Sequence, residues 1–184
     1  AGIQVDVGVC EQQAIAQNQG FLKAIATGKP YVRLKIAASL DGRTAMASGE
    51  SKWITGPQAR QDVQHWRALS GVVITGIETV LADDCQLNVR ELSDTHLDQV
   101  VQPLRLVLDR RGRLPRTAKI LQQPETVLVM GPARPELVAL GVRFIAIQPL
   151  TELLAYLTAH YKIYDVLVEA GATVSTAFLQ DNVV

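Results

Sequence analysis

The segment EAGATVSTAF, residues 169 to 178, combines a carboxylate, a glycine turn and a run of small and hydroxyl residues. Glu169 ends an apolar run that is typical of a buried strand, and the small residues after Gly171 predict the start of a helix. The exposed N–H groups and the positive end of the helix dipole would suit a pyrophosphate at this turn. The segment lacks the GxGxxG pattern of a Rossmann fold, and many strand-glycine-helix turns bind nothing, so the signal is weak when it stands alone.

Two arginines could supply a phosphate site elsewhere in the chain. Arg67 and Arg90 would together offer two forked sets of donors, and guanidinium geometry is well matched to a phosphate. Arg67 follows Trp66 on a predicted helix, at a step of about 100° from the apolar face, so a solvated position on the surface is the alternative.

Four further residues have both a structural and a functional interpretation. Lys35 lies on a predicted strand and is either an edge-strand charge kept for solubility or part of a site. Asp83 and Asp84 either cap or turn a loop, or they place a carboxylate in the site. Trp53 is more often a core residue than a platform for a cofactor.

A sheet is needed to bring these residues together. Apolar runs predict strands at residues 32–38, 71–75, 104–109, 126–130, 142–147 and 164–171, with helix patterns at 133–140 and 149–160. Strands that alternate with helices favour an α/β fold with a mostly parallel central sheet and helices on both faces. In such sheets ligands bind beyond the carboxyl ends of the strands. The residues just past the apolar runs are Ala38, Ser39, Thr75, Gly76, Asp109, Arg110, Met130, Gly131 and residues 169–171.

The N-terminal third carries its own element signals. Residues 3–9 alternate as a strand does, and a helix pattern follows over 11–26 and is closed by Gly28, Lys29 and Pro30. Thr55 with Gln58 predicts a capping box for the next helix, with Pro57 in the first turn. The expected buried face of that helix consists of Ala59, Val63, Trp66 and Leu69.

Composition narrows the class of protein. Eighteen basic and 18 acidic residues cancel, so no general attraction to nucleic acid or to an anionic membrane is expected. Cys10 and Cys85 predict two ordinary thiols. No apolar run reaches the length of a membrane span, and the first residues show no signal-peptide pattern. A cytoplasmic enzyme fits this composition best.

Metal-binding patterns are missing from the sequence. The three histidines show no ligand spacing, and neither H-x-E nor P-C-x-x-C, the signatures of zinc deaminases, occurs. We therefore expect no metal site in this chain.

The most distinctive segment is YVRLKIAASLDGRTAMASGESKWIT, residues 31 to 55. Its strand pattern ends in small residues from Ala37 onward, as it would if a flat group had to lie against the backbone, and Asp41 with Gly42 predicts a turn. Nearly residue for residue, the segment resembles the start of the reductase domain of the bifunctional riboflavin-biosynthesis deaminase/reductase, a family with the dihydrofolate-reductase-like fold.

The resemblance implies a division of the chain. Residues 1–30 would correspond to the tail of a preceding deaminase domain and a connecting helix, and residues 31–184 to an NADPH-dependent reductase domain without its C-terminal strands. Zinc would belong only to the absent deaminase domain, and the parent protein is expected to form a homo-oligomer. The fragment itself is expected to bind NADPH weakly, to turn over poorly and to self-associate.

The resemblance also implies a reaction and its site. The substrate would be 5-amino-6-(5-phospho-D-ribosylamino)uracil, which NADPH reduces to the ribitylamino product. Catalysis would fall to Glu169 and Asp83, for charge stabilisation and substrate orientation, and to Lys35 as a polar or proton-donating partner. The cofactor-binding residues would be Ala37, Trp53, Thr55, Thr79, Asp83, Gly171, Ala172, Thr173, Val174 and Ser175. The substrate-binding residues would be Ser51, Arg67, Leu87, Arg90 and Glu169.

One departure from the family and two alternative functions stay open. Arg110 and Arg111 stand where the family commonly has a small hydroxyl residue, and they could favour the 2′-phosphate of NADPH or simply face solvent. A dihydrofolate-reductase-like pterin or folate reductase is the alternative enzyme, and independence from a ribose phosphate would distinguish it. A catalytically silent nucleotide-binding fragment is the alternative that is not an enzyme.

Overall fold

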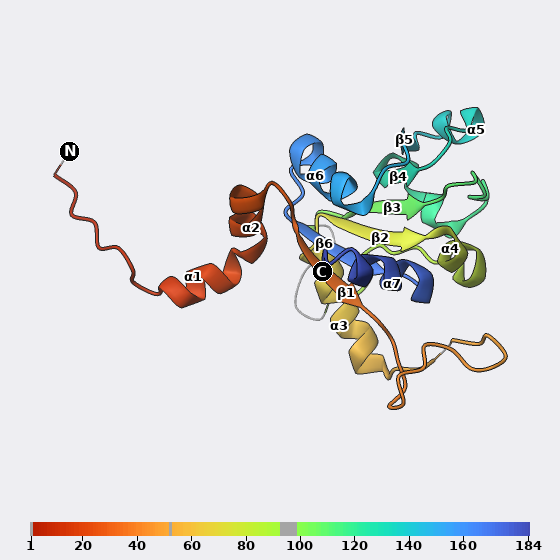
Figure 1. Cartoon of the computed structure of the whole chain (residues 1–184), viewed down its shortest axis with the longest axis horizontal. Coiled ribbons are helices and arrows are strands. Elements are labelled where there is room, and N and C mark those ends of the chain that lie inside the picture. Colours follow the sequence, from red (N-terminus) through yellow and green to blue (C-terminus); the bar gives the residue numbers. More distant parts are fainter. Residues whose placement is uncertain (1, 52, 93–98) are drawn as a thin grey trace.

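The computed structural model describes residues 2–51, 53–92 and 99–184 and contains a six-stranded sheet (Figure 1). Neighbouring strands all run parallel, in the order β1-β6-β2-β3-β4-β5. The strands are β1 (Tyr31–Lys35), β2 (Val72–Gly76), β3 (Leu104–Leu108), β4 (Val127–Met130), β5 (Arg143–Ile145) and β6 (Asp165–Glu169). The predicted parallel α/β fold is confirmed, and each strand predicted from residue 32 onward is present.

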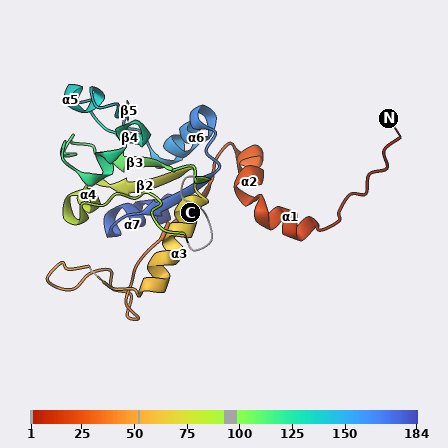
Figure 2. The ribbon, with the colours of Figure 1, turned by 180° about the vertical axis from the view of Figure 1, so that it is seen from behind.

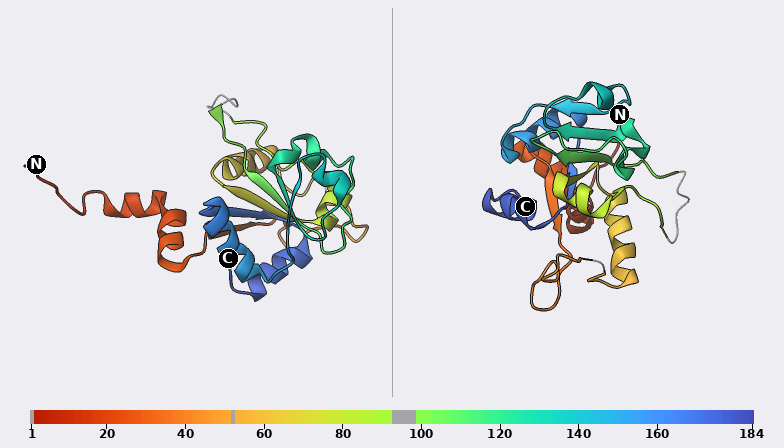
Figure 3. Two further views of the ribbon diagram at one scale, coloured as in Figure 1. Left: turned by 90° about the horizontal axis from the view of Figure 1, so that it is seen from above. Right: turned by 90° about the vertical axis from the view of Figure 1, so that its right-hand side faces the viewer.

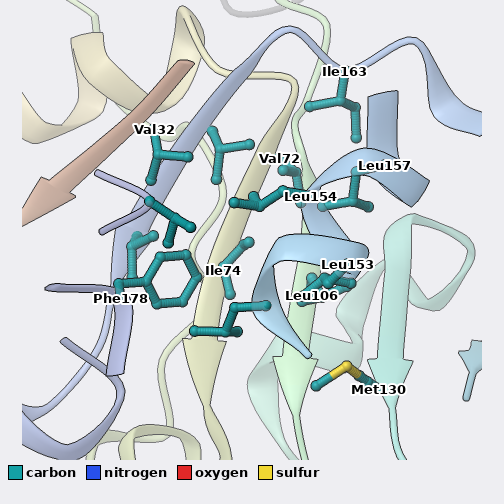
Figure 4. Packing of buried hydrophobic residues seen from close by; sticks show 14 of the residues in the cluster. Val32, Val72, Ile74, Leu106, Met130, Leu153, Leu154, Leu157, Ile163 and Phe178 are labelled. Atoms are coloured by element: carbon teal, nitrogen blue, oxygen red, sulfur yellow. The ribbon is translucent and has the colours of Figure 1, made fainter. Parts of the chain in front are cut away.

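Helices pack on both faces of this sheet. One core joins leucines of α6 and Phe178 of α7 to strand residues such as Ile74 and Leu106 (Figure 4). The opposite core joins Val80 of α4 and Leu137 of α5 to alternate strand residues. Strands covered on both faces read as continuous apolar runs, which is why the sequence pattern located them. The helices are α1 (Glu11–Gln17), α2 (Gln19–Thr27), α3 (Pro57–Ala68), α4 (Ile77–Asp83), α5 (Pro135–Val138), α6 (Leu150–Tyr161) and α7 (Ala172–Gln180).

The carboxyl ends of the strands meet at one edge of the sheet. Lys35 at the end of β1 is the register partner of Glu169 at the end of β6. Helix α4 begins directly after β2, and α7 begins two residues after β6. Figure 2 shows α4 and α7 at this edge and α2 at the opposite one. The topology therefore brings strand ends and helix N-termini together, where parallel α/β folds bind ligands.

Residues 2–17 extend away from the sheet as an arm, and α2 joins this arm to the sheet (Figures 1 and 3). The expected strand at 3–9 is not formed: Val7 is 94% exposed, and no described strand pairs with this segment. The single helix expected over 11–26 is divided at Asn18, whose side chain donates to the Ala14 carbonyl at 2.8 Å and competes with the helical backbone. Gly28 ends α2 with a φ of 71°, as predicted.

A long loop joins β1 to α3, and its predicted turn is confirmed. The Gly42 N–H donates to the Ser39 carbonyl at 2.8 Å, and Gly42 has a φ of 81°. The capping box at the far end of the loop is wrong, because α3 begins one residue later than the box requires. Gly56 is the N-cap, without a side-chain cap hydrogen bond, and Pro57 opens the helix as expected.

The polar connection after α4 has no helix or strand over residues 84–92, and its stretch 93–98 lies outside the described residues. Within the described ranges, none of the helices has both the length and the apolar character needed to cross a membrane.

Candidate functional site

Most of the predicted site residues surround one cavity of about 800 Å³ at the carboxyl edge of the sheet. This volume lies within the range of small-molecule and cofactor sites. The wall comes from β1 and the loop after it, from α3 and α4, from the segment that follows α4, and from the junction of β6 with α7. The predicted residues that line it are Lys35, Ala37, Ser51, Trp53, Thr55, Arg67, Thr79, Asp83, Leu87, Arg90, Glu169, Gly171 and Ala172.

The other predicted cofactor-binding residues lie away from the cavity wall. Arg110 is exposed beyond the end of β3, and Thr173 is exposed in the first turn of α7. The Val174 side chain packs closely against Gly76 at the end of β2. A Cβ on Gly76 would lie only 2.8 Å from the side chain of Val174. Ser175 is buried, and its hydroxyl donates to a backbone carbonyl at 3.3 Å.

The start of α7 presents backbone N–H groups at this edge. The first intrahelical bond runs from the Ser175 N–H to the Gly171 carbonyl, so the amides before it have no acceptor within the helix. The Gly171 N–H donates to Thr79 Oγ1 at 3.2 Å, which ties the turn to α4. A Cβ on Gly171 would meet only Thr79 within 4 Å, so the turn is open on its outer side. These features fit an anionic group such as a pyrophosphate.

A buried ion pair lies in the cavity wall. Arg67 Nε lies 2.6 Å from Glu169 Oε1 and Nη2 lies 2.9 Å from Oε2, so the guanidinium grips the carboxylate with two hydrogen bonds. The Arg67 side chain is 9% exposed and that of Glu169 is 7% exposed. Arg67 Nη1 also donates to the Asn88 carbonyl at 3.1 Å. A phosphate clamp of Arg67 and Arg90 stays a prediction, but Glu169 already occupies one edge of the Arg67 fork.

Helix α3 is rotated relative to the orientation expected from its apolar residues. Arg67 is buried, so the alternative of a solvated Arg67 on the surface is wrong. The buried side chains of α3 are Gln64 and Arg67. Together with Arg60 they form a polar stripe at helical spacing, and all three line the cavity. The apolar face expected to be buried is half-buried or exposed; its residues are Ala59, Val63, Trp66 and Leu69.

Lys35, Asp83 and Glu169 share this cavity, as predicted. As register partners on parallel strands, Lys35 and Glu169 project from the same face of the sheet. Because β1 is an edge strand of the described sheet, Lys35 also fits the edge-charge alternative. The loop-capping role falls to Asp84, whose Oδ1 accepts from the Lys119 N–H at 2.9 Å and whose Oδ2 lies 3.1 Å from Lys119 Nζ.

Leu87 and Arg90 reach the cavity from residues 86–90, which we call the 86–90 segment. Leu87 is buried although its φ is 56°, a left-handed conformation that is costly for a leucine. Arg90 Nη1 donates to the side-chain oxygens of Gln86 and Asn88, at 3.2 Å each. Desolvation and then the nearby charge of Arg67 lower the pKa of Arg90. The two guanidinium groups therefore lie close enough for their charges to interact.

Some cavity residues were missed from the sequence, among them Arg60, Gln64 and Cys85. The spacing of the polar stripe on α3 could have revealed the first two, whereas no pattern singles out Cys85. Trp53 is 72% exposed, so the core alternative for it is wrong. The Arg60 guanidinium lies 4.4 Å from the centre of the Trp53 ring, and its Nη1 donates to the Thr55 carbonyl at 2.8 Å.

The pKa of the Cys85 thiol depends on its burial and on the charged side chains in the cavity wall. Burial raises the pKa of its thiol to about 11, the charges of Asp83 and Glu169 act in the same direction, and Arg67 opposes them. In the part of the chain that the structure describes, no three His, Cys, Asp or Glu side chains are grouped to hold a metal ion.

Comparison with known proteins assigns this chain to a family. Residues 30–184 match the RibD C-terminal domain. Riboflavin biosynthesis protein RibD of Escherichia coli is 50% identical over 131 residues, which are 67% of this chain and 36% of that protein. The RibD of Buchnera aphidicola is 34% identical over 100% of this chain and 53% of its own length.

Solved structures agree with the sequence comparison. Acinetobacter baumannii RibD, form 1, is 68% identical with a TM-score of 0.96, over 100% of this chain and 51% of that one. A Thermotoga maritima diaminohydroxyphosphoribosylaminopyrimidine deaminase/5-amino-6-(5-phosphoribosylamino)uracil reductase is 31% identical with a TM-score of 0.82, over 98% of this chain and 50% of that one. The riboflavin biosynthesis reductase Rib7 of Saccharomyces cerevisiae, 20% identical with a TM-score of 0.66, shares the fold.

The parallel sheet and its strand-end cavity define an α/β domain, and the match to the solved A. baumannii RibD places its fold in the dihydrofolate-reductase-like class. The chain belongs to the family of RibD C-terminal domains, the reductase part of riboflavin biosynthesis proteins. It spans about a third to a half of the length of these relatives. The assignment of residues 1–30 to the tail of a deaminase domain stays a prediction.

Proposed function

We propose that this domain reduces 5-amino-6-(5-phospho-D-ribosylamino)uracil to the ribitylamino product with NADPH. The observation that supports this most directly is the gathering of Lys35, Asp83 and Glu169 at one cavity beside the open start of α7. The name of the T. maritima relative carries the same reductase activity for that protein.

NADPH, when bound, supplies the hydride. The residues that would hold it are on the cavity wall and at the start of α7. The N–H groups after Gly171 bind the pyrophosphate, and Thr79 keeps the turn in shape. Ala37, two residues past the end of β1, has a short side chain that leaves room for a flat ring. Arg110, exposed past β3, is assigned to the 2′-phosphate.

The chain's own residues bind the sugar and move protons. The ribose must open to an imine, so its ring oxygen takes up a proton and its C1′ becomes an acceptor of hydride. Lys35 is assigned to proton donation, and the carboxylates of Glu169 and Asp83 stabilise the cationic carbon and orient the substrate. Four residues are assigned to substrate binding, with the two arginines on the phosphate: Ser51, Arg67, Leu87 and Arg90.

The test is oxidation of NADPH in the presence of the aminouracil phosphate, with mass spectrometry of the product. Lys35→Met and Glu169→Gln should each lower kcat, whereas Lys162→Met should not, because Lys162 lies at the far end of α6. Turnover of dihydrofolate without the phosphorylated aminouracil would favour the pterin or folate alternative. Binding of NADPH without turnover of either substrate would indicate a silent module.

A further inference from the structure

A β-turn follows β3 at the carboxyl edge of the sheet. The Gly112 N–H donates to the Asp109 carbonyl at 3.3 Å, which makes Arg110 and Arg111 the central residues of the turn. Both arginines are exposed, and Gly112 has a φ of 64°. Aspartate in the first position and glycine in the fourth are favoured in such turns. We call residues 109–114 the 109–114 loop, and it presents two adjacent arginines to solvent.

Asp109 holds the 109–114 loop from inside. It is 0% exposed, and its Oδ2 accepts from the N–H of buried Leu114 at 2.8 Å. Its own N–H donates to the Met130 carbonyl at 3.1 Å. A Cβ on Gly131 would lie 2.0 Å from the Asp109 carbonyl oxygen, so the end of β4 packs against this backbone. The turn is therefore anchored to the buried sheet on both of its sides.

The carboxyl group of Asp109 also carries a cost. Among the described residues, Asp109 Oδ1 is buried without a hydrogen-bond partner. A buried polar atom without a partner lowers stability, and an apolar side chain at this position would avoid the loss. Positions where a sequence keeps such a local cost are often functional. The turn that Asp109 holds is therefore a candidate for a role in binding.

Arg134, in the connection that follows β4, holds the 109–114 loop from outside. Its Nη1 donates to the carbonyls of Gly112 and Leu114 at 3.1 and 2.5 Å. Its Nε and Nη2 donate to Glu136 Oε1 at 2.9 and 2.6 Å, which keeps the guanidinium in place. The backbone after the turn is thus fixed by a second set of contacts that is independent of Asp109.

Arg113 attaches the loop to the cavity wall. It pairs with Glu78 of α4, one of the residues that line the cavity. Arg113 and Arg134 thus have carboxylate partners, whereas no ion pair within the described ranges involves Arg110 or Arg111. The donors of these two side chains are available to an anionic ligand, and guanidinium geometry is well matched to a phosphate.

We propose that Asp109 is a positioning residue, which fixes the β-turn so that Arg110 meets the 2′-phosphate of NADPH and which thereby sets a preference for NADPH over NADH. The inference rests on the proposed function for the place of the cofactor and for the role of Arg110. A turn that is already ordered loses less entropy when the phosphate binds. Without Asp109 the loop would still carry Arg110, but its backbone would become ordered only on binding.

The test titrates the protein with NADPH and with NADH, and it follows the Gly112 and Leu114 amides by residue-resolved hydrogen exchange. Asp109→Ala removes the acceptor of the Leu114 N–H, whereas Asp109→Asn keeps an oxygen that can accept from it. Arg110→Gln removes the charge that is assigned to the phosphate. The matched control is Asp165→Ala, which removes an aspartate at the opposite edge of the sheet.

Arg110→Gln should lose about tenfold to a hundredfold in affinity for NADPH and should bind NADH as the unchanged protein does. Asp109→Ala should lose about tenfold for NADPH, change by less than about twofold for NADH, and exchange both amides about tenfold faster. Asp109→Asn should restore both readouts, and Asp165→Ala should change neither. Equal losses for the two cofactors in Asp109→Ala would overturn the proposal, because Asp109 would then only support the fold.

A second variant guards against a failure of Asp109→Ala to fold. The Arg134 side chain is 28% exposed and acts on the same loop from outside. Arg134→Met should speed exchange in the loop and should lower the affinity for NADPH alone, by about threefold to tenfold. Faster exchange with an unchanged preference for NADPH in this folded variant would refute the role of an ordered loop.

The same titrations separate this inference from the proposed function. If the unchanged protein does not bind NADPH, or if Arg110→Gln alters neither affinity, the proposed place of the cofactor is wrong and the inference falls with it. If Arg110→Gln loses affinity for NADPH while Asp109→Ala keeps the preference of the unchanged protein, the positioning role of Asp109 alone is wrong.

Discussion

The two ends of strand β6 carry the same kind of ion pair in different surroundings. At the amino end, Arg33 Nη1 lies 2.7 Å from Asp165 Oδ1, and the side chains are 25% and 28% exposed. At the carboxyl end, Arg67 meets Glu169 with two hydrogen bonds, and the side chains are 9% and 7% exposed. The pairs therefore differ in burial and in the number of contacts.

They also differ in what lies beside them. Asp165 packs against Gly20 of α2, and the Arg33 guanidinium lies 4.6 Å from the centre of the Tyr31 ring and 5.1 Å from that of Trp66. The pair at the carboxyl end instead borders the cavity. The Arg33–Asp165 pair thus joins two neighbouring strands, whereas the pair at the carboxyl end lies where parallel sheets bind ligands.

Removal of Arg67 is expected to change the free energy of unfolding more than any other substitution below. It tests whether burial is what distinguishes the two ion pairs. Arg67→Gln leaves the Glu169 carboxylate buried without its partner, which should lower the free energy of unfolding by about 3–5 kcal/mol. Chemical denaturation at neutral pH measures it. The double change with Glu169→Gln should recover much of the loss, and a single variant as stable as the unchanged protein would mean that water reaches this end of β6.

A smaller effect is expected at the amino end from Gly20→Ala. The new Cβ would lie 2.1 Å from Asp165 Oδ2 and 2.7 Å from the Tyr164 carbonyl, so α2 must shift away from β6. Overpacking of this kind costs about 1–3 kcal/mol. The control is Gly56→Ala, whose Cβ would meet only Gln58 Oε1, at 3.6 Å, so its smaller expected loss comes from the N-cap position and not from a clash. Equal stability of the two variants would show that α2 is not packed against Asp165.

The fold was largely predictable because both faces of the sheet are covered. Strands buried on both sides are mostly apolar, so β2, β3, β4 and β6 stood out as nearly continuous runs. The segment 3–9 has the alternation of a strand but no partner to pair with in the described structure, and periodicity alone cannot reveal a missing partner. The break at Asn18 depends on one side-chain hydrogen bond.

The site was predictable where strand ends supply it and less so where a helix does. Glu169 follows from strand periodicity and parallel topology, whereas Lys35, inside the predicted strand, was assigned to the site through the family resemblance. Arg67 was placed one step from an assumed apolar face, but α3 turns its polar stripe inward because its partners are a carboxylate and backbone groups. Such partners, Glu169 and the 86–90 segment, lie far from α3 in the chain, so only the folded structure shows them.

Asp165→Asn keeps the size of the side chain at the amino end and removes its charge. With the pair partly exposed and joined by a single contact, the loss should stay below about 1 kcal/mol and should shrink as salt is added. Denaturation at low and high ionic strength measures both. A loss as large as that of Arg67→Gln would contradict the view that burial separates the two ends of β6.

The ionisation of the Cys85 thiol should leave stability at neutral pH unchanged, and it sharpens the electrostatic side of the comparison because Cys85 and Glu169 line the same cavity. Burial and neighbouring carboxylates raise its pKa from 9.0 to about 11, so near pH 9 about one molecule in a hundred carries the thiolate. At that pH iodoacetamide should therefore modify exposed Cys10 first and should modify Cys85 about fiftyfold more slowly than in denaturant, where half of the thiol is ionised. Since the folded state holds this proton more tightly than the unfolded state, the stability it contributes is complete below about pH 9 and falls as the pH rises toward 11. Cys85→Ala should remove that part of the pH dependence, and equal rates for Cys85 in the folded and denatured protein would show that the carboxyl end of β6 is as open to water as the amino end.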